Sequence, residues 1–88
     1  MKTEFRDGFT KDLKEISEKA ILNRIRTAIE LIEKVTTLEG VPQVKKLKGG
    51  GNFYRIRVGD YRIGIALDQD TVVFVRCLNR KDIYKFFP

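Results

Sequence analysis

Three arginines are spaced so that they could form a cationic site on one face of a β-sheet. They lie within the segment FYRIRVGDYRIGIALDQDTVVFVRC, residues 53–77, in which polar and apolar residues alternate. Alternation predicts β-strands, because successive side chains of a strand point to opposite faces. Arg55 and Arg57 then share one face of a first strand, and Arg62 lies on the next. Guanidinium groups keep their charge and bind phosphate oxygens in pairs, so this spacing favours an anionic ligand.

A two-residue turn at 59–60 sets the register of these two strands. Glycine at the first central position of such a turn is typical of a β-hairpin. The pairing places Arg57 opposite Arg62, and Arg55 opposite Gly64. Like charges directly opposite each other each cost roughly a few tenths of a kcal/mol. An anion bound over these arginines would offset that cost, and the small Gly64 leaves room for it.

The third strand is expected to pair with the second in the register that buries Val73, Val75 and Cys77. Arg76 then lies next to Arg62 and becomes a fourth arginine of the cationic face. The strands carry acidic residues on this face only at their ends. A purely structural alternative, in which the arginines pair with Asp or Glu side chains from a loop, stays open.

Further basic and aromatic residues flank the strands. Lys45, Lys46 and Lys48 precede the first strand, and Arg80, Lys81, Tyr84, Phe86 and Phe87 follow the third. A short helix is expected after the third strand, on which Arg80 and Tyr84 would share a face. The Tyr84 ring could stack on a base or anchor the chain end, and both interpretations stay open. For Phe86 and Phe87 we favour the apolar anchor.

The net charge of +6 and the pI near 9.7 favour acidic partners such as nucleic acid. The chain has no histidine and a single cysteine, so we expect neither a zinc site nor a disulfide, and no other metal or cofactor. We find no run approaching the ~20 apolar residues of a membrane span. These features predict a cytoplasmic protein without a membrane partner.

The cationic strands need a supporting layer, which the N-terminal half of the chain can supply. Apolar residues recur at three- and four-residue steps from Phe9 to Val35, which predicts helices at about 8–16 and 18–37. Ser17 fits a cap between them. Strands are expected at about 3–6, 53–58, 61–67 and 71–78. The sequence thus predicts one α+β domain, 1–88, with an N-terminal helical hairpin packed on a small antiparallel β-sheet.

The segment between the second helix and the first arginine strand contains three consecutive glycines, 49–51. No Lys-Ser or Lys-Thr follows these glycines, and no helix is expected to begin there. A phosphate-cradling loop is therefore a poor interpretation. We interpret the segment as a flexible link into the sheet.

Three motifs, in this order and spacing, resemble the RelE/ParE superfamily of bacterial and archaeal toxins. They are KLKG before the sheet, YRIRVGDYRI across the hairpin, and RKDIY near the C-terminus. The resemblance covers nearly the whole chain and implies a small α+β, microbial ribonuclease-type fold. It implies no cofactor. In the RelE branch it implies a messenger-RNA endonuclease that cuts in the ribosomal A site and is held inactive by a cognate antitoxin.

The resemblance also implies roles for particular residues. It assigns catalytic roles to Arg55, Arg57, Arg62, Arg80 and Tyr84, with Lys81 replacing Arg80 if the alignment shifts by one residue. Three positions depart from the family pattern: arginines replace lysines at the first basic pair, Asn79 stands where histidine is frequent, and Ile65 replaces an aromatic residue. We expect Lys45, Lys46, Lys48, Arg76 and Lys81 to contribute to RNA binding.

Two alternatives to the nuclease remain. In the ParE branch, the same scaffold implies an inhibitor of DNA gyrase without a nuclease site. A non-catalytic basic domain that binds only RNA or an antitoxin is the other. The convergence of arginines and a tyrosine favours the nuclease, since arginine stabilises negative charge on phosphorus. Arginine is a poor general base, so an enzyme without histidine is expected to be slow when free of the ribosome.

Overall fold

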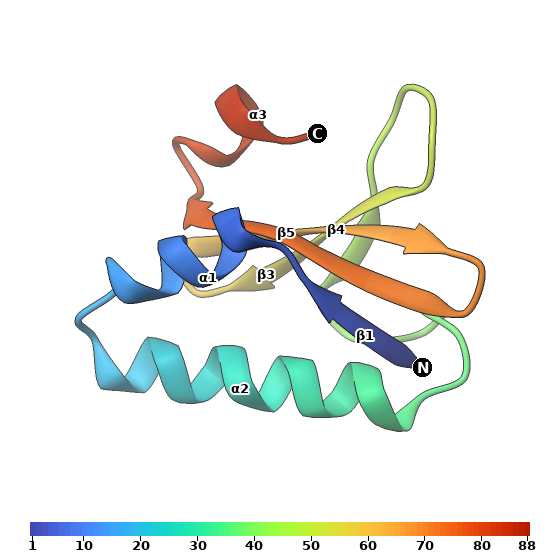
Figure 1. Cartoon of the computed structure of the whole chain (residues 1–88), viewed down its shortest axis with the longest axis horizontal. Coiled ribbons are helices and arrows are strands. Elements are labelled where there is room, and N and C mark those ends of the chain that lie inside the picture. Colours follow the sequence, from blue (N-terminus) through green and yellow to red (C-terminus); the bar gives the residue numbers. More distant parts are fainter.

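A five-stranded sheet with the order β1-β5-β4-β3-β2 forms the centre of the molecule, with helices on both of its faces (Figure 1). The computed structural model describes every residue from Met1 to Pro88. The elements are β1 Lys2–Phe5, α1 Asp7–Lys14, α2 Lys19–Lys34, β2 Val44–Lys46, β3 Phe53–Val58, β4 Tyr61–Asp68, β5 Thr71–Asn79 and α3 Ile83–Phe86. The predicted α+β class is confirmed. No helix combines the length and apolar character that crossing a bilayer requires.

The β3–β4 hairpin has the predicted register. Arg57 pairs with Arg62, and Arg55 pairs with Gly64. Gly59 has a φ of 57°. This positive angle at the first central position is the one that a type II′ turn requires, and glycine adopts it without steric cost.

The sheet is mixed, and not purely antiparallel as predicted. β1 runs parallel to β5, with Lys2 opposite Thr71. Parallel neighbours need a long crossover connection, which here contains α1, α2 and three further strands. β2 forms inside the segment that we interpreted as a flexible link, and it pairs antiparallel with β3.

The predicted register of the third strand is correct in its C-terminal half and wrong in its N-terminal half. Cys77 faces Ile63 as expected, but the pairing shifts between Gly64 and Ile65, so that Ile65 pairs with Phe74. One extra residue, Val75, enters β5 at this bulge and exchanges the faces of the residues before it. Val72 and Phe74 therefore enter the core. Arg76 lies after the bulge, keeps its predicted face and pairs with Gly64, diagonal to Arg62.

The helices pack differently from a simple hairpin. α2 crosses beneath the sheet, whereas α1 lies beside β5, beyond the end of β1 (Figure 1). Both helices end before the predicted boundaries. Ser17 is not a cap: Glu18 occupies the N-cap of α2 and makes no side-chain cap hydrogen bond.

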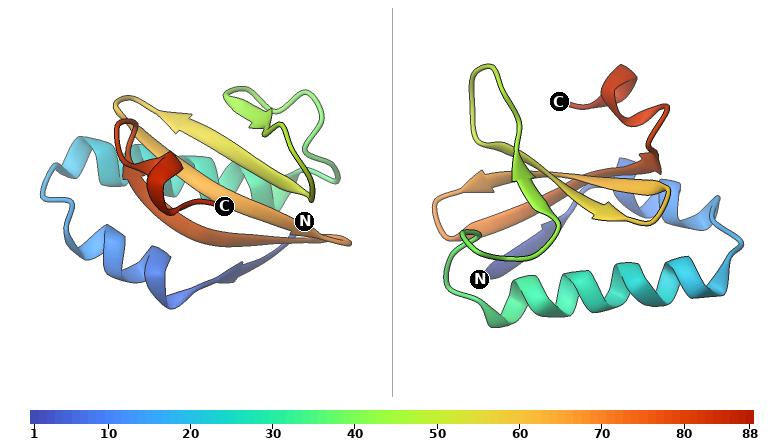
Figure 2. Two further views of the ribbon diagram at one scale, coloured as in Figure 1. Left: turned by 90° about the horizontal axis from the view of Figure 1, so that it is seen from above. Right: turned by 180° about the vertical axis from the view of Figure 1, so that it is seen from behind.

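The main core lies between α2 and the sheet. It includes Phe9 and Ile25 from the helices and Ile56, Ile63 and Phe74 from the strands. The opposite face of the sheet carries the predicted arginines. α3 and the segment 47–52 rise on that second face, away from α2 (Figures 1 and 2). The helical layer thus supports the sheet from one side and leaves the arginine side for other contacts.

Candidate functional site

The five residues predicted to be catalytic come together at one end of the second sheet face. The pKa of Arg62 is lowered, first by partial burial and then by the positive charges of Arg55, Arg57 and Arg80. Tyr84 acts in the opposite direction on the same pKa. Residues from β3, β4, the turn after β5, and α3 therefore lie within electrostatic reach of one guanidinium group. We call these five residues the arginine cluster.

The arginine cluster contains no carboxylate partner. The structure has three salt bridges, and none of them includes Arg55, Arg57, Arg62 or Arg80. Arg62 instead donates from Nη1 to the carbonyl oxygens of Gly59 at 2.7 Å and of Tyr61 at 2.9 Å. These bonds fix the guanidinium near the β3–β4 turn. Four positive charges thus converge without compensation, which is the arrangement expected of a site for an anion.

The turn after β5 places Arg80 beside the hairpin. The backbone N–H of Arg80 donates to the carbonyl oxygen of Asp60 at 2.8 Å. The Asn79 side chain accepts from the Lys81 N–H at 3.0 Å, which closes the turn. Arg80 therefore precedes α3, and the prediction that it shares a helix face with Tyr84 is wrong. The two residues converge because the turn bends toward Asp60.

α3 lies over the sheet (Figure 2, left), and Tyr84 is one of its residues. Tyr84 is 58% exposed, whereas Ile83 and Phe87 at the two ends of the segment are buried. The Phe87 ring occupies the space above Gly64, where an added Cβ would lie 2.6 Å from ring atoms. Phe53 meets the same ring edge-on, with centroids 5.6 Å apart. The small Gly64 accommodates this ring and not a bound anion, which corrects the prediction.

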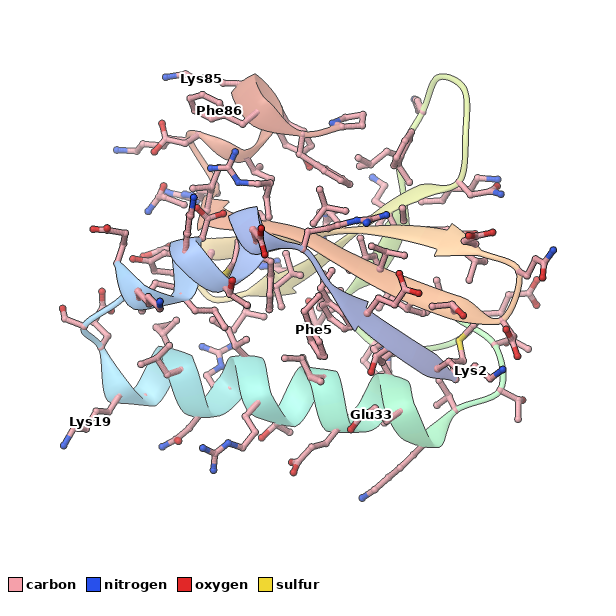
Figure 3. The ribbon with its side chains drawn as sticks, in the orientation of Figure 1. Lys2, Phe5, Lys19, Glu33, Lys85 and Phe86 are labelled. Carbon is pink, nitrogen blue, oxygen red and sulfur yellow. The ribbon has the colours of Figure 1, made fainter.

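Phe87 is thus an anchor, as favoured from the sequence, while Phe86 is 59% exposed. Phe86 lies on the opposite side of the sheet from α2 (Figure 3). Its ring centroid is 5.4 Å from the Arg76 guanidinium carbon, within the range of a cation–π contact.

Arg76 is separate from the arginine cluster, because Asp12 of α1 binds it. Arg76 donates from Nε to Oδ2 at 2.7 Å and from Nη2 to Oδ1 at 3.1 Å. This bidentate bond raises the pKa of Arg76. Oδ2 also accepts the backbone N–H of Cys77 at 2.9 Å. Asp12 therefore accepts a backbone N–H at the edge of β5 that β1 leaves open. For this one arginine, the structural alternative of pairing with a carboxylate is correct.

The four lysines predicted to bind RNA occupy different places. Lys45 pairs with Arg55 across β2 and β3, so it extends the cationic face. Lys46 pairs with Tyr54 and shares the helix-side face. Lys48 and Lys81 are exposed, the first in the segment before β3 and the second in the turn before α3.

Two residues that hold arginines of the second sheet face were missed from the sequence. Asp12 lies between Phe9 and Ile16 in the apolar stripe of α1, and a carboxylate in such a stripe was a readable signal of a buried partner. Gln43 has a φ of 70°, and its carbonyl oxygen accepts from the Arg57 N–H at 3.0 Å and from Arg55 Nη1 at 3.4 Å. No sequence signal marks Gln43.

Comparison with known proteins gives a consistent picture. The family described as the ParE toxin of type II toxin-antitoxin system, parDE, matches residues 3–84. Toxin RelE3 of Methanocaldococcus jannaschii is 46% identical over 89 aligned positions, which cover 100% of both chains. The putative toxin RelE1 of the same organism is 30% identical and covers 82% of this chain and 80% of its own.

A solved structure is also similar throughout. The toxin chain in the crystal structure of the RelB-RelE antitoxin-toxin complex from Methanococcus jannaschii has a TM-score of 0.82 and 45% identity. The alignment covers 97% of this chain and 99% of that one. At this TM-score and coverage the two chains share one fold.

Proposed function

Because the chain belongs to the RelE/ParE superfamily of toxins of type II toxin-antitoxin systems, we propose that it is an endoribonuclease that cleaves messenger RNA and thereby inhibits translation. One observation carries the proposal: four arginines and an exposed tyrosine converge without a carboxylate partner. A scissile phosphate and its adjoining base are the ligands that match these groups.

Cleavage would proceed by attack of the RNA 2′-hydroxyl oxygen on the adjacent phosphorus. The bond from phosphorus to the 5′-oxygen breaks, which leaves a 2′,3′-cyclic phosphate and a 5′-hydroxyl. One proton leaves the 2′-hydroxyl, and one proton is delivered to the 5′-oxygen. Negative charge on the phosphorane oxygens grows in the transition state, and Arg57, Arg62 and Arg80 would stabilise it by charge-assisted hydrogen bonds.

Arg62 is the best-held member of this set. Its two bonds to the turn carbonyls restrict the guanidinium before substrate binds, so little reorganisation is needed during the reaction. Its pKa is lowered first by partial burial and then by the crowded positive charges of Arg55, Arg57 and Arg80. A dianionic transition state relieves that crowding more than the monoanionic substrate does, and this difference favours catalysis over mere binding.

Proton transfer is assigned to groups other than arginine. The chain has no histidine, so Lys81, Tyr84 or a nucleotide of the ribosomal A site must move the protons. Tyr84 would mainly stack on a base and hold the 2′-hydroxyl in line. This division explains why we expect slow cleavage of free RNA and faster cleavage on the ribosome.

Lys45, Lys48 and Lys81 would bind the RNA backbone on either side of the cluster. Lys45 continues the cationic face from Arg55. Arg76 is left out of this set, because Asp12 already holds its guanidinium. Lys46 faces the helical layer and is left out as well.

A cognate antitoxin is the proposed protein partner. The related toxin from Methanococcus jannaschii was crystallised with the antitoxin RelB. A net charge of +6 would speed association with an acidic segment that covers the arginine cluster. Co-expression with the adjacent reading frame should give a complex that survives purification.

The proposal is tested by replacing Arg62 with alanine. Primer extension on a translated message should show a cleavage rate lower by about 10²-fold or more, with a much smaller change in RNA affinity. Arg26→Ala is the matched control, because Arg26 is exposed on α2, on the other side of the sheet. A folded Arg62→Ala protein that cuts normally would overturn the catalytic assignment.

Gyrase inhibition is the second candidate, since the matching family description names ParE. Inhibition of DNA supercoiling by the wild-type protein, without cleavage of a translated message, would establish it. Arg62→Ala would then have to be judged on gyrase binding and not on RNA.

A further inference from the structure

A second polar pocket adjoins the arginine cluster at the β3–β4 turn. It has a volume of about 320 Å³ and is lined by Arg24, Gln43, Arg57 and Gly59, none of them apolar. Arg24 comes from α2, so the pocket joins the helical layer to the arginine face. Arg24 and Gln43 were not singled out from the sequence.

The turn residue Gly59 separates the pocket from the cluster. A Cβ built on Gly59 would lie 3.0 Å from Arg24 Nη1, so the Arg24 guanidinium rests directly against the turn. The carbonyl oxygen of the same glycine accepts from Arg62 Nη1 at 2.7 Å. Arg24 and Arg62 thus both contact Gly59, and Arg57 belongs to both the pocket and the arginine cluster.

Both guanidinium groups of the pocket lack partners. Arg24 and Arg57 make no salt bridge, and neither side chain donates a hydrogen bond within the protein. Both residues are exposed, so no folding requirement brings them together. Two adjacent positive charges repel each other, and a phosphate group would compensate both with bidentate bonds.

We propose that Arg24 and Arg57 form a subsite for a backbone phosphate of single-stranded RNA that flanks the scissile phosphate. This proposal rests on the proposed ribonuclease function. Because Arg57 borders both sites, the strand would pass from the cluster around the β3–β4 turn toward α2. The subsite carries no base-reading group and holds the strand in position.

The subsite is tested by the salt dependence of RNA binding. The probe is a single-stranded 2′-O-methyl oligonucleotide, which lacks the attacking hydroxyl and cannot be cut by this chemistry. Loss of one phosphate contact should make the slope of log K against log salt shallower by about 0.7. Arg24→Ala should show this change, because Arg24 makes no internal hydrogen bond whose loss would disturb the fold.

Arg26→Ala is the control, with the same charge change on the same exposed helix. Arg26 lines a different surface, with Leu22 and Ile29. A shallower slope in Arg24→Ala, and a wild-type slope in Arg26→Ala, supports the subsite. Equal slopes in all three proteins would overturn the subsite. An equal decrease of the slope in both variants would overturn it as well, because Arg24 would then act only as diffuse charge.

Cleavage of a translated message, measured in parallel, separates this inference from the proposed function. If the wild-type protein does not cut the message, but Arg24→Ala still makes the salt dependence of RNA binding shallower, the subsite is supported and the nuclease is refuted. A cutting enzyme with an unchanged Arg24→Ala slope keeps the nuclease and refutes the subsite. If Arg24→Ala weakens only the complex with an antitoxin, the pocket holds an acidic side chain and the subsite is likewise refuted.

Discussion

The ring of Phe87 covers Gly64, and a Cβ on that glycine would lie 2.6 Å from the ring atoms. A residue at the centre of the sheet therefore lacks a side chain so that the C-terminal segment can lie flat on it. Because Tyr84 stands three residues before Phe87, this contact also fixes where the tyrosine is presented.

Gly64→Ala should unseat the C-terminal segment. The added methyl group collides with a buried ring, and overpacking of this kind costs about 1–3 kcal/mol. Thermal melts should show the loss, and cleavage should fall because Tyr84 is displaced. Adding Phe87→Ala removes the collision, so the double variant should lose less stability than the sum of the single ones. Additive losses would show that the two residues are not coupled.

Tyr84→Ala should lower cleavage by weakening placement of the base, since stacking of one base is worth about 1–3 kcal/mol. Tyr84→Phe should retain most of the activity, because the proposed role of Tyr84 is stacking, which the phenylalanine ring keeps. Phe86→Ala removes an equally exposed aromatic ring from the same helix and should cut nearly as the wild type does. Primer extension on a translated message distinguishes the three. Equal losses in Tyr84→Ala and Phe86→Ala would point to a general effect on α3.

Asp12→Ala should destabilise the fold more than any other single carboxylate removal. It leaves the Arg76 guanidinium and the Cys77 N–H without their acceptor, and loss of one partner from a largely buried pair costs about 3 kcal/mol. Denaturant unfolding measures the change. Asp70→Ala is the control, because its pair with Lys2 is exposed and 3.9 Å long and should contribute less than about 1 kcal/mol.

Cys77 should be unreactive in the folded protein and should destabilise it at high pH. Burial raises the pKa of the Cys77 thiol from 9.0 to about 12. Between these values the unfolded chain loses the proton and the folded chain keeps it, so stability falls as the pH rises through this window. A thiol reagent should modify the native protein only as it unfolds. Cys77→Ala is the comparison, because its free energy of unfolding should not fall above pH 9 through loss of a thiol proton. If the two proteins lost stability equally between pH 9 and pH 12, the prediction would be contradicted.

The sequence predicted the features that depend on local alternation. The β3–β4 register follows from the turn at 59–60 and from the period of two in each strand, so Arg57 opposite Arg62 could be deduced. The gathering of Arg80 and Tyr84 with these arginines followed from the family resemblance. Neither inference needed knowledge of how β1 pairs.

The failures have physical causes that local patterns do not contain. A single bulge in β5 exchanges the faces of Val73 and Phe74 relative to the predicted pairing, and alternation alone cannot locate an extra residue. The pairing of β1 with β5, and of Asp12 with Arg76, joins residues more than sixty positions apart. Such contacts are set by packing of the whole domain and not by the segments that make them.

The parallel pairing of β1 with β5 has a consequence for the timing of folding during synthesis. Lys2 finds its strand partner only at Thr71, so the apolar faces of β1, α1 and α2 wait for most of the chain to be translated. Arg80 and Tyr84 follow β5 in the chain, so they are synthesised later than both strands of this pair. The arginine cluster is therefore completed only after β1, β5 and the segment that follows β5 have all been synthesised.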